Sequence, residues 1–169
     1  MRRLIALSLT ALGLSACVAT TFPETTQELR DMPRGALAVK SEEFMVARSV
    51  GAVMNTFQTR GAACLHFDIS STMYGGTMVG GMRSSVNMQD VYRPRFESSG
   101  STRTLVVQHY NRANIGNPGW YPRFVADVTP AAGGSKVTLY GPGLQSEFIR
   151  EPIRAWARGD TRPCPAEKY

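Results

Sequence analysis

The sequence predicts an α+β fold in which an antiparallel sheet of four to six strands packs in two layers against an N-terminal and a C-terminal helix. Apolar residues recur at helical spacing in two places, over residues 50–57 and 148–156. Between them, over residues 65–140, apolar and polar residues mostly alternate with a period of two, which is typical of half-buried strands. Such a sheet must cover its apolar face, and two helices can do so.

The folded part is expected to begin near Ser41, with a short strand over residues 44–48. A helix then begins after Ser49, a favourable N-cap residue, and ends at Gly61. Its apolar residues are Val50, Val53, Met54 and Phe57. An alternative interpretation runs a single helix over residues 41–60. We prefer the strand followed by the helix.

The strands of the sheet are predicted from the alternation that follows Gly61. They cover residues 65–69, 86–92, 102–111, 123–129 and 136–140. The second strand is expected to end before Pro94. The last two are expected to form a hairpin around the turn residues 130–135.

The last helix has one apolar face and is expected to stop at Gly159. That face consists of Phe148, Ile149, Ile153 and Trp156. Pro152 either begins the main helix in its first turn or kinks a longer one. The order of the elements resembles a shortened helix-grip or START-like fold. That resemblance implies a curved sheet wrapped around a long C-terminal helix.

The segment over residues 73–82 is rich in methionine and glycine, and it predicts a mobile loop or a β-hairpin. Methionine also lines adaptable binding surfaces, so an apolar lip over a pocket is the alternative. Tyr74, Met78 and Met82 are therefore candidate residues for binding a ligand or partner. Thioethers suit Cu(I), but the methionine spacing matches no tight ligand cluster, and we predict no metal or other cofactor.

Trp120 and Tyr121 form a second candidate binding edge, in a loop of glycine, proline and asparagine residues over 114–122. Exposed, these aromatic side chains would anchor a partner or a sugar ring. Buried, they would close one end of the sheet.

The N-terminus has the layout of a secretory signal. Met1-Arg2-Arg3 is positively charged, and an apolar run of about eleven residues follows, against the roughly twenty that a transmembrane helix needs. The run ends in Leu14-Ser15-Ala16-Cys17, which resembles the lipobox of bacterial lipoproteins. The resemblance implies cleavage before Cys17, and a diacylglycerol thioether on that cysteine, usually with an N-acyl chain. Val18, where inner-membrane retention usually calls for aspartate, favours the outer membrane.

The chain is thus divided into a signal peptide (1–16), a lipidated cysteine with a flexible tether (17–40) and a single globular domain (41–169). Removing the leader leaves 153 of the 169 residues, enough for one domain with a real core. Arg2 and Arg3 leave with the leader, so the formal charge falls from +6 to +4. The remaining arginines are scattered along the sequence, so no nucleic-acid partner is predicted.

Cys64 and Cys164 remain in the mature chain, and they are expected to form a disulfide. An exported protein matures in an oxidising compartment, where such a pair normally joins. The bond would tie the first core helix to the C-terminal tail.

Few polar residues are candidates for chemistry. His66 and Asp68 would project from one face of a strand, and with His109 and Asp127 they could form a metal or acid–base site. The simpler interpretation is a solvated outer face, so no catalytic or metal site is predicted, and the protein is not expected to be an enzyme.

The predicted function is binding, by a lipoprotein held on the periplasmic side of the outer membrane. Its partner would be another envelope component. An alternative is a carrier of an apolar ligand or lipid, which requires an enclosed pocket of roughly 300 Å³ or more between helix and sheet. An envelope hydrolase is a third, less favoured class.

Overall fold

The computed structural model describes most of the chain after residue 21. It describes residues 22–34, 39–79, 82–111, 119–144, 146–161 and 163–165, and for 71–79 and 82–88 the backbone alone. The elements in chain order are α1 (Thr26–Asp31), β1 (Val39–Val46), α2 (Val50–Cys64), β2 (Phe67–Val79), β3 (Met82–Ser99), β4 (Thr102–Asn111), β5 (Tyr121–Ala131), β6 (Gly134–Pro142) and α3 (Glu147–Arg158).

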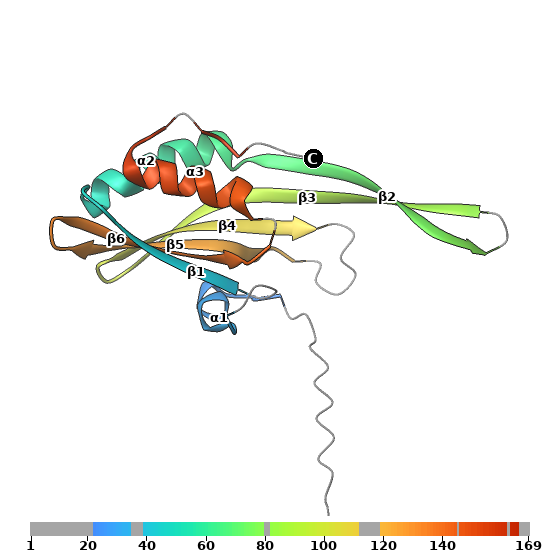
Figure 1. Ribbon diagram of the computed structural model, residues 1–169, viewed down its shortest axis with the longest axis horizontal. Coiled ribbons are helices and arrows are strands. Elements are labelled where there is room, and N and C mark those ends of the chain that lie inside the picture. Colours follow the sequence, from blue (N-terminus) through green and yellow to red (C-terminus); the bar gives the residue numbers. More distant parts are fainter. Residues whose placement is uncertain are drawn as a thin grey trace, which may run out of the picture.

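The strands form one antiparallel sheet in the order β1-β6-β5-β4-β3-β2 (Figure 1). Strands β2 to β6 follow one another across the sheet, and β1 pairs with β6 at the far edge. The predicted α+β architecture is therefore confirmed. So is the strand followed by a helix at the start, where the Ser49 side chain caps α2 by accepting a hydrogen bond from the Ala52 N–H at 3.2 Å. The predicted bounds are wrong, because β1 covers Val39–Val46 and α2 continues past Gly61 to Cys64.

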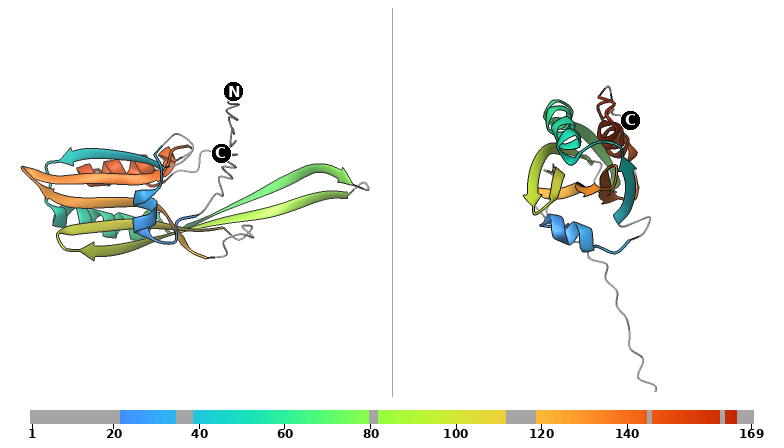
Figure 2. Two further views of the ribbon diagram at one scale, coloured as in Figure 1. Left: turned by 90° about the horizontal axis from the view of Figure 1, so that it is seen from below. Right: turned by 90° about the vertical axis from the view of Figure 1, so that its left-hand side faces the viewer.

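Helices α2 and α3 lie side by side on one face of the sheet, which we call the inner face (Figure 2). The core cluster between these layers includes Phe57 and Trp156 from the helices and Leu105 and Leu139 from the sheet, all fully buried. Arg48 joins the two helices, because its guanidinium donates to the Trp156 carbonyl of α3 and to the Ala52 carbonyl of α2. A cation at the C-terminus of α3 also suits the helix dipole.

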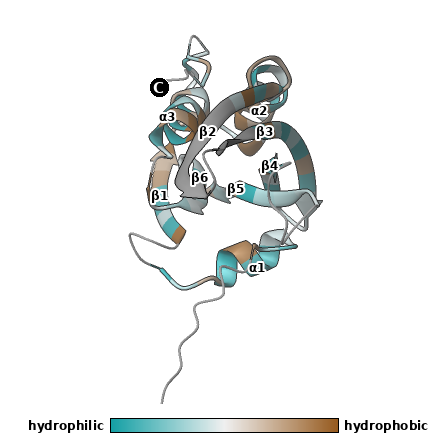
Figure 3. Ribbon diagram, turned by 90° about the vertical axis from the view of Figure 1, so that its right-hand side faces the viewer, coloured by the Kyte–Doolittle hydropathy of each residue, from teal (hydrophilic) through white to brown (hydrophobic). Residues whose placement is uncertain are grey.

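Helix α1 lies on the opposite, outer face of the sheet (Figure 3). Leu29 is 3% exposed and shares a small cluster with Val106 and Val125 of the sheet. Arg30 donates two hydrogen bonds of 2.8 Å to the Asp127 carboxylate. The prediction of a flexible tether over 17–40 is therefore wrong for residues 22–34, which are docked on the domain.

Strand β3 runs through Pro94 rather than ending before it. Proline is tolerated where one edge of a strand needs no donor. Strand β2 begins at Phe67, opposite Tyr92, so this edge of β3 has no partner strand at Pro94. The hairpin of β5 and β6 is also tighter than predicted, with Ala131 paired to Gly134.

Helix α3 contains Pro152 in its interior and ends at Arg158, directly before the capping residue Gly159, whose φ of 99° is left-handed. It is held to the edge of the sheet by Arg150, which is fully buried. The Arg150 guanidinium donates to the Lys40 carbonyl of β1 at 2.8 Å and to the Gly141 carbonyl of β6 at 3.0 Å. In the part of the chain that the structure describes, no helix has the length and apolar character needed to cross a bilayer.

Candidate functional site

The most unusual feature of the fold is a two-stranded extension of the sheet, which we call the arm (residues 70–79 and 82–89). Strand β4 ends at Asn111, opposite Asp90, so the residues of β3 before Asp90 pair with β2 alone. The pairing continues from Ser70 and Gln89 to Val79 and Met82, with an irregularity after Gly75. Figure 2 shows the arm leaving one end of the sheet and extending well beyond the body.

Of the mobile loop or β-hairpin predicted for residues 73–82, the structure shows the hairpin, and its strands are much longer than the predicted segment. Tyr74, Met78 and Met82 all lie on the arm, and the structure describes their backbone alone.

The composition of the arm leaves its backbone edges unprotected. Among the described residues, no strand pairs with either outer edge of the arm. Soluble proteins usually protect such edges with charged residues or proline, because exposed peptide groups pair with other chains. From Ser70 to Gln89 the sequence has no proline and a single charged residue, Arg83. A two-stranded ribbon alone in water is also only marginally stable.

A buried polar cluster joins three strands at the base of the arm. The His109 ring of β4 contacts the Tyr121 hydroxyl of β5 through Nδ1 and the Asp90 carboxylate of β3 through Nε2, the latter at 2.7 Å. Asn111 donates to the same carboxylate oxygen at 2.6 Å. The His109 ring also packs between the rings of Tyr92 and Tyr121, with centroid distances of 4.7 and 5.1 Å.

Burial and hydrogen bonding together set the protonation states in this cluster. It lowers the pKa of His109 below its usual value, against the opposing hydrogen bond to Asp90. Burial acts to raise the pKa of Asp90, but the hydrogen bonds from His109 and Asn111 lower it overall. A neutral His109 therefore donates a hydrogen bond from Nε2 to the Asp90 carboxylate and accepts a hydrogen bond at Nδ1 from the Tyr121 hydroxyl. Because burial also raises the pKa of Tyr121, this residue remains a phenol, and the cluster acts as a satisfied structural junction.

The structure separates the two residues of the predicted aromatic edge. Trp120 is 46% exposed and lies beside Tyr110, with ring centroids 5.6 Å apart. Tyr121 is 3% exposed and packs against Phe22 at 4.7 Å. Of the two alternatives, Tyr121 follows the buried one and closes the end of the sheet, so it is not a surface binding residue. Of this pair, only Trp120 is exposed.

The polar residues considered for a metal or acid–base site do not meet. Asp68 is opposite Val91 in the sheet and binds Arg93, whereas His109 is opposite Tyr92 and so lies on the other face. Asp127 is bound by Arg30 of α1, as described above. No group of three or more histidine, cysteine or acidic residues within the described ranges could hold a metal ion.

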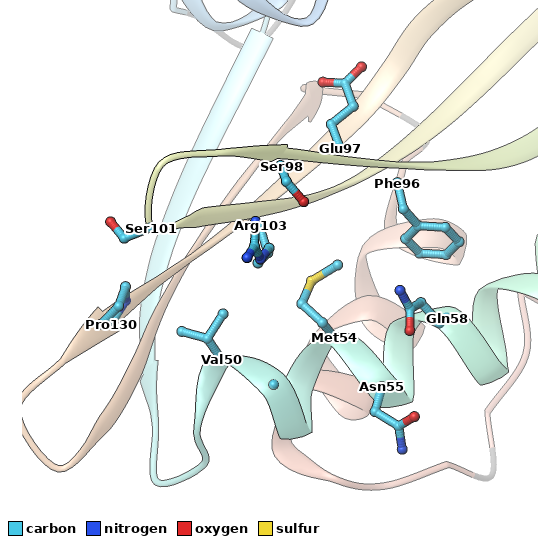
Figure 4. A pocket seen from close by; sticks show the side chains of 11 residues that line it. Val50, Met54, Asn55, Gln58, Phe96, Glu97, Ser98, Ser101, Arg103 and Pro130 are labelled. Carbon is cyan, nitrogen blue, oxygen red and sulfur yellow. The ribbon is translucent and has the colours of Figure 1, made fainter.

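A groove of about 740 Å³ separates α2 from the hairpin of β3 and β4 (Figure 4). Its lining is mixed: Met54 and Phe96 are apolar, whereas Gln58, Ser98 and Arg103 are polar. The groove is open to solvent and lies beside the turn between β3 and β4, at the end of the sheet opposite the arm. It therefore differs from the enclosed apolar pocket that a lipid carrier requires.

The predicted disulfide between Cys64 and Cys164 is present. It joins the end of α2 to the C-terminal tail, which is also held by the Trp156 indole donating to the Pro163 carbonyl at 2.7 Å. Cys17, the predicted site of lipidation, lies outside the described residues.

Comparison with known proteins does not assign the chain to a family. No family model matches the sequence, and no curated protein matches it. A crystal structure of Protein CV1439 from Chromobacterium violaceum is similar at a TM-score of 0.37 and 10% identity, over 74% of this chain and 98% of that chain. A structural similarity with so low a TM-score does not indicate a shared function.

Proposed function

We propose that this protein is a lipid-anchored lipoprotein of the bacterial cell envelope that binds a protein partner through the arm. The anchor is Cys17, acylated after removal of residues 1–16, and the domain faces the periplasm from the outer membrane. The lipobox-like Leu14-Ser15-Ala16-Cys17 and the Cys64–Cys164 disulfide support an exported protein.

The observation that carries the binding function is the arm. Its two strands offer backbone donors and acceptors along two outer edges, with a single charge in twenty residues to oppose association. A partner that adds a strand to one edge satisfies those groups, and this β-augmentation is a common mode of peptide recognition. Binding also stabilises a ribbon that is marginal when isolated.

Side-chain contacts join the base of the arm to the body of the molecule. The His109 cluster connects β3, β4 and β5 where the arm leaves the sheet, and the Phe67 and Tyr92 rings stack beside it at 4.8 Å. A partner that holds the arm is thereby coupled to the whole domain.

An arm-deletion variant tests the proposal. Residues 71–88 are replaced by Asn-Gly, because Ser70 and Gln89 are directly paired and a two-residue type I′ turn can join them. We expect this variant to fold and to be acylated like the wild-type protein. The wild-type protein and the variant are each cross-linked in intact envelopes and isolated. The partner should be recovered with the wild-type protein and not with the variant.

A photo-crosslinking residue placed on the arm at Thr77 should capture one stoichiometric partner. The same residue at Thr59, an exposed position of α2, is the matched control and should not capture it. Retention of the partner by the arm-deletion variant, or its equal capture from Thr59, would contradict the proposed role of the arm.

A further inference from the structure

We infer that the end of the domain that carries Phe22, Trp120 and Leu144 lies against the bilayer, with the Trp120 indole in the lipid headgroup region. The inference rests on the acyl anchor at Cys17 that forms part of the proposed function. It adds a lipid surface as a second binding partner, and it assigns the residues that contact this surface.

The length of the chain between anchor and domain limits how far the domain can stand from the membrane. Phe22 packs on Tyr121 at 4.7 Å, and the segment after it is fixed by α1 on the outer face of the sheet. Four residues lie between Cys17 and Phe22, and the five Cα–Cα steps between these two residues span at most ~18 Å in a fully extended chain. The strands of the body are about ten residues long, or roughly 34 Å. The Phe22 end must therefore be the end near the bilayer.

The exposed apolar side chains agree with this orientation. The exposed large hydrophobic residues of the described chain are Met45, Trp120 and Leu144. Trp120 directly precedes β5, and Leu144 follows the end of β6, which is the neighbouring antiparallel strand, so both lie at the Phe22 end. Met45 is opposite Lys136, near the other end of the sheet.

Trp120 has the character of an interfacial anchor. The indole combines a large apolar ring with one N–H donor, and tryptophan and tyrosine are enriched where hydrocarbon meets water. Trp120 is 46% exposed and has Tyr110 beside it. Leu144, 56% exposed, adds an aliphatic side chain at the same end.

The orientation has a consequence for the arm. The last residues of β4 pair with β3 at the base of the arm, so the arm leaves the body from the Phe22 end (Figure 2). Because the arm continues the strands beyond this end, the strands must lie at a shallow angle to the membrane for the arm to stay outside the hydrocarbon, and the base of the arm then lies at the membrane surface. The partner of the arm is accordingly expected to be a protein that resides in or on the same membrane.

Tryptophan fluorescence on vesicles tests the inference directly. The acylated full-length mature protein is reconstituted on vesicles of phosphatidylethanolamine and phosphatidylglycerol, with and without lipids brominated in the acyl chain. The chain has two tryptophans, and Trp156 is fully buried in the core. We expect bromolipid to quench the emission of Trp120 and to leave that of Trp156. Trp120→Phe should abolish the quenching while the protein still floats with the vesicles.

Matched controls move the exposed tryptophan from position 120 to another exposed position. In the Trp120→Phe background, Leu144→Trp should restore the quenching and Met45→Trp should not. Quenching from position 45 and not from 144, or equal quenching of the wild-type and Trp120→Phe proteins, would overturn the orientation while leaving the anchor intact. A protein that fails to float because Cys17 carries no acyl chain would overturn the anchor and the orientation together.

Discussion

Leu29→Ala is expected to release α1 from the outer face of the sheet without unfolding the domain. The substitution removes three carbon atoms from a side chain that is 3% exposed, at about 0.8 kcal/mol for each. The surrounding cluster is small and lies at the surface, so little cavity energy is added, and the total is about 2–3 kcal/mol. A helix of six residues does not persist in water without such packing.

Hydrogen exchange measured by mass spectrometry on the peptide that covers α1 provides the assay. A loss of about 2–3 kcal/mol corresponds to exchange that is about 30- to 150-fold faster. Gln27→Ala is the matched control, because Gln27 lies on the exposed side of the same helix and should change the rate little. Unchanged exchange in Leu29→Ala, or equal acceleration in Gln27→Ala, would refute the argument that packing on the sheet holds α1.

Three further predictions follow from the core. The Cys64→Ala, Cys164→Ala double variant removes a bond spanning 100 residues, and the free energy of unfolding in urea should fall by as much as ~4–5 kcal/mol; an unchanged midpoint would refute this. The pKa of the buried His109 is lowered, so protons bind more readily to the unfolded chain. The free energy of unfolding should therefore be highest above about pH 6.5 and should fall below that pH by up to about 1.4 kcal/mol per pH unit. His109→Gln should flatten this dependence, and an equally steep slope in the variant would assign it to other groups. Gly141→Ala places a Cβ 2.4 Å from the buried Phe124 ring and should lower the free energy of unfolding by about 1–3 kcal/mol, measured by thermal denaturation. Gly51→Ala, on an open face of α2, should raise this free energy by about 0.5–1 kcal/mol. A change of the same sign in both variants would contradict the packing around Gly141.

Local periodicity was sufficient to predict the elements that form the core. The apolar residues of α2 and α3 repeat over several turns, and β4 was predicted with its observed bounds, Thr102–Asn111. The disulfide followed from the number of cysteines and the expected compartment. These signals are local or compositional, so they do not require knowledge of the strand register.

Features that depend on distant residues could not be predicted from the sequence. Helix α1 has one buried side chain, so its sequence shows no hydrophobic periodicity. Asp127, the partner of its Arg30, is 97 residues away in the sequence. An arginine such as Arg150 is expected at the surface, but this side chain is fully buried. Its burial is tolerated because carbonyl groups of β1 and β6 accept its hydrogen bonds.

The candidate site was predicted in part for the same reason. Glycine and methionine between residues 73 and 82 indicated a hairpin, but its length depends on where β4 stops pairing with β3. The cluster of Asp90, His109 and Tyr121 comes from three strands, and only their register brings it together.

Hydrogen exchange of the arm in its native envelope tests the central claim most directly. Isolated envelopes and purified acylated protein are labelled in parallel, and the exchange of peptides within residues 70–89 is compared. If a partner pairs with the edges of the arm, these amides should be protected in the envelope and should exchange faster in the purified protein. Equal exchange of the arm in both samples, with the body unchanged, would contradict the account.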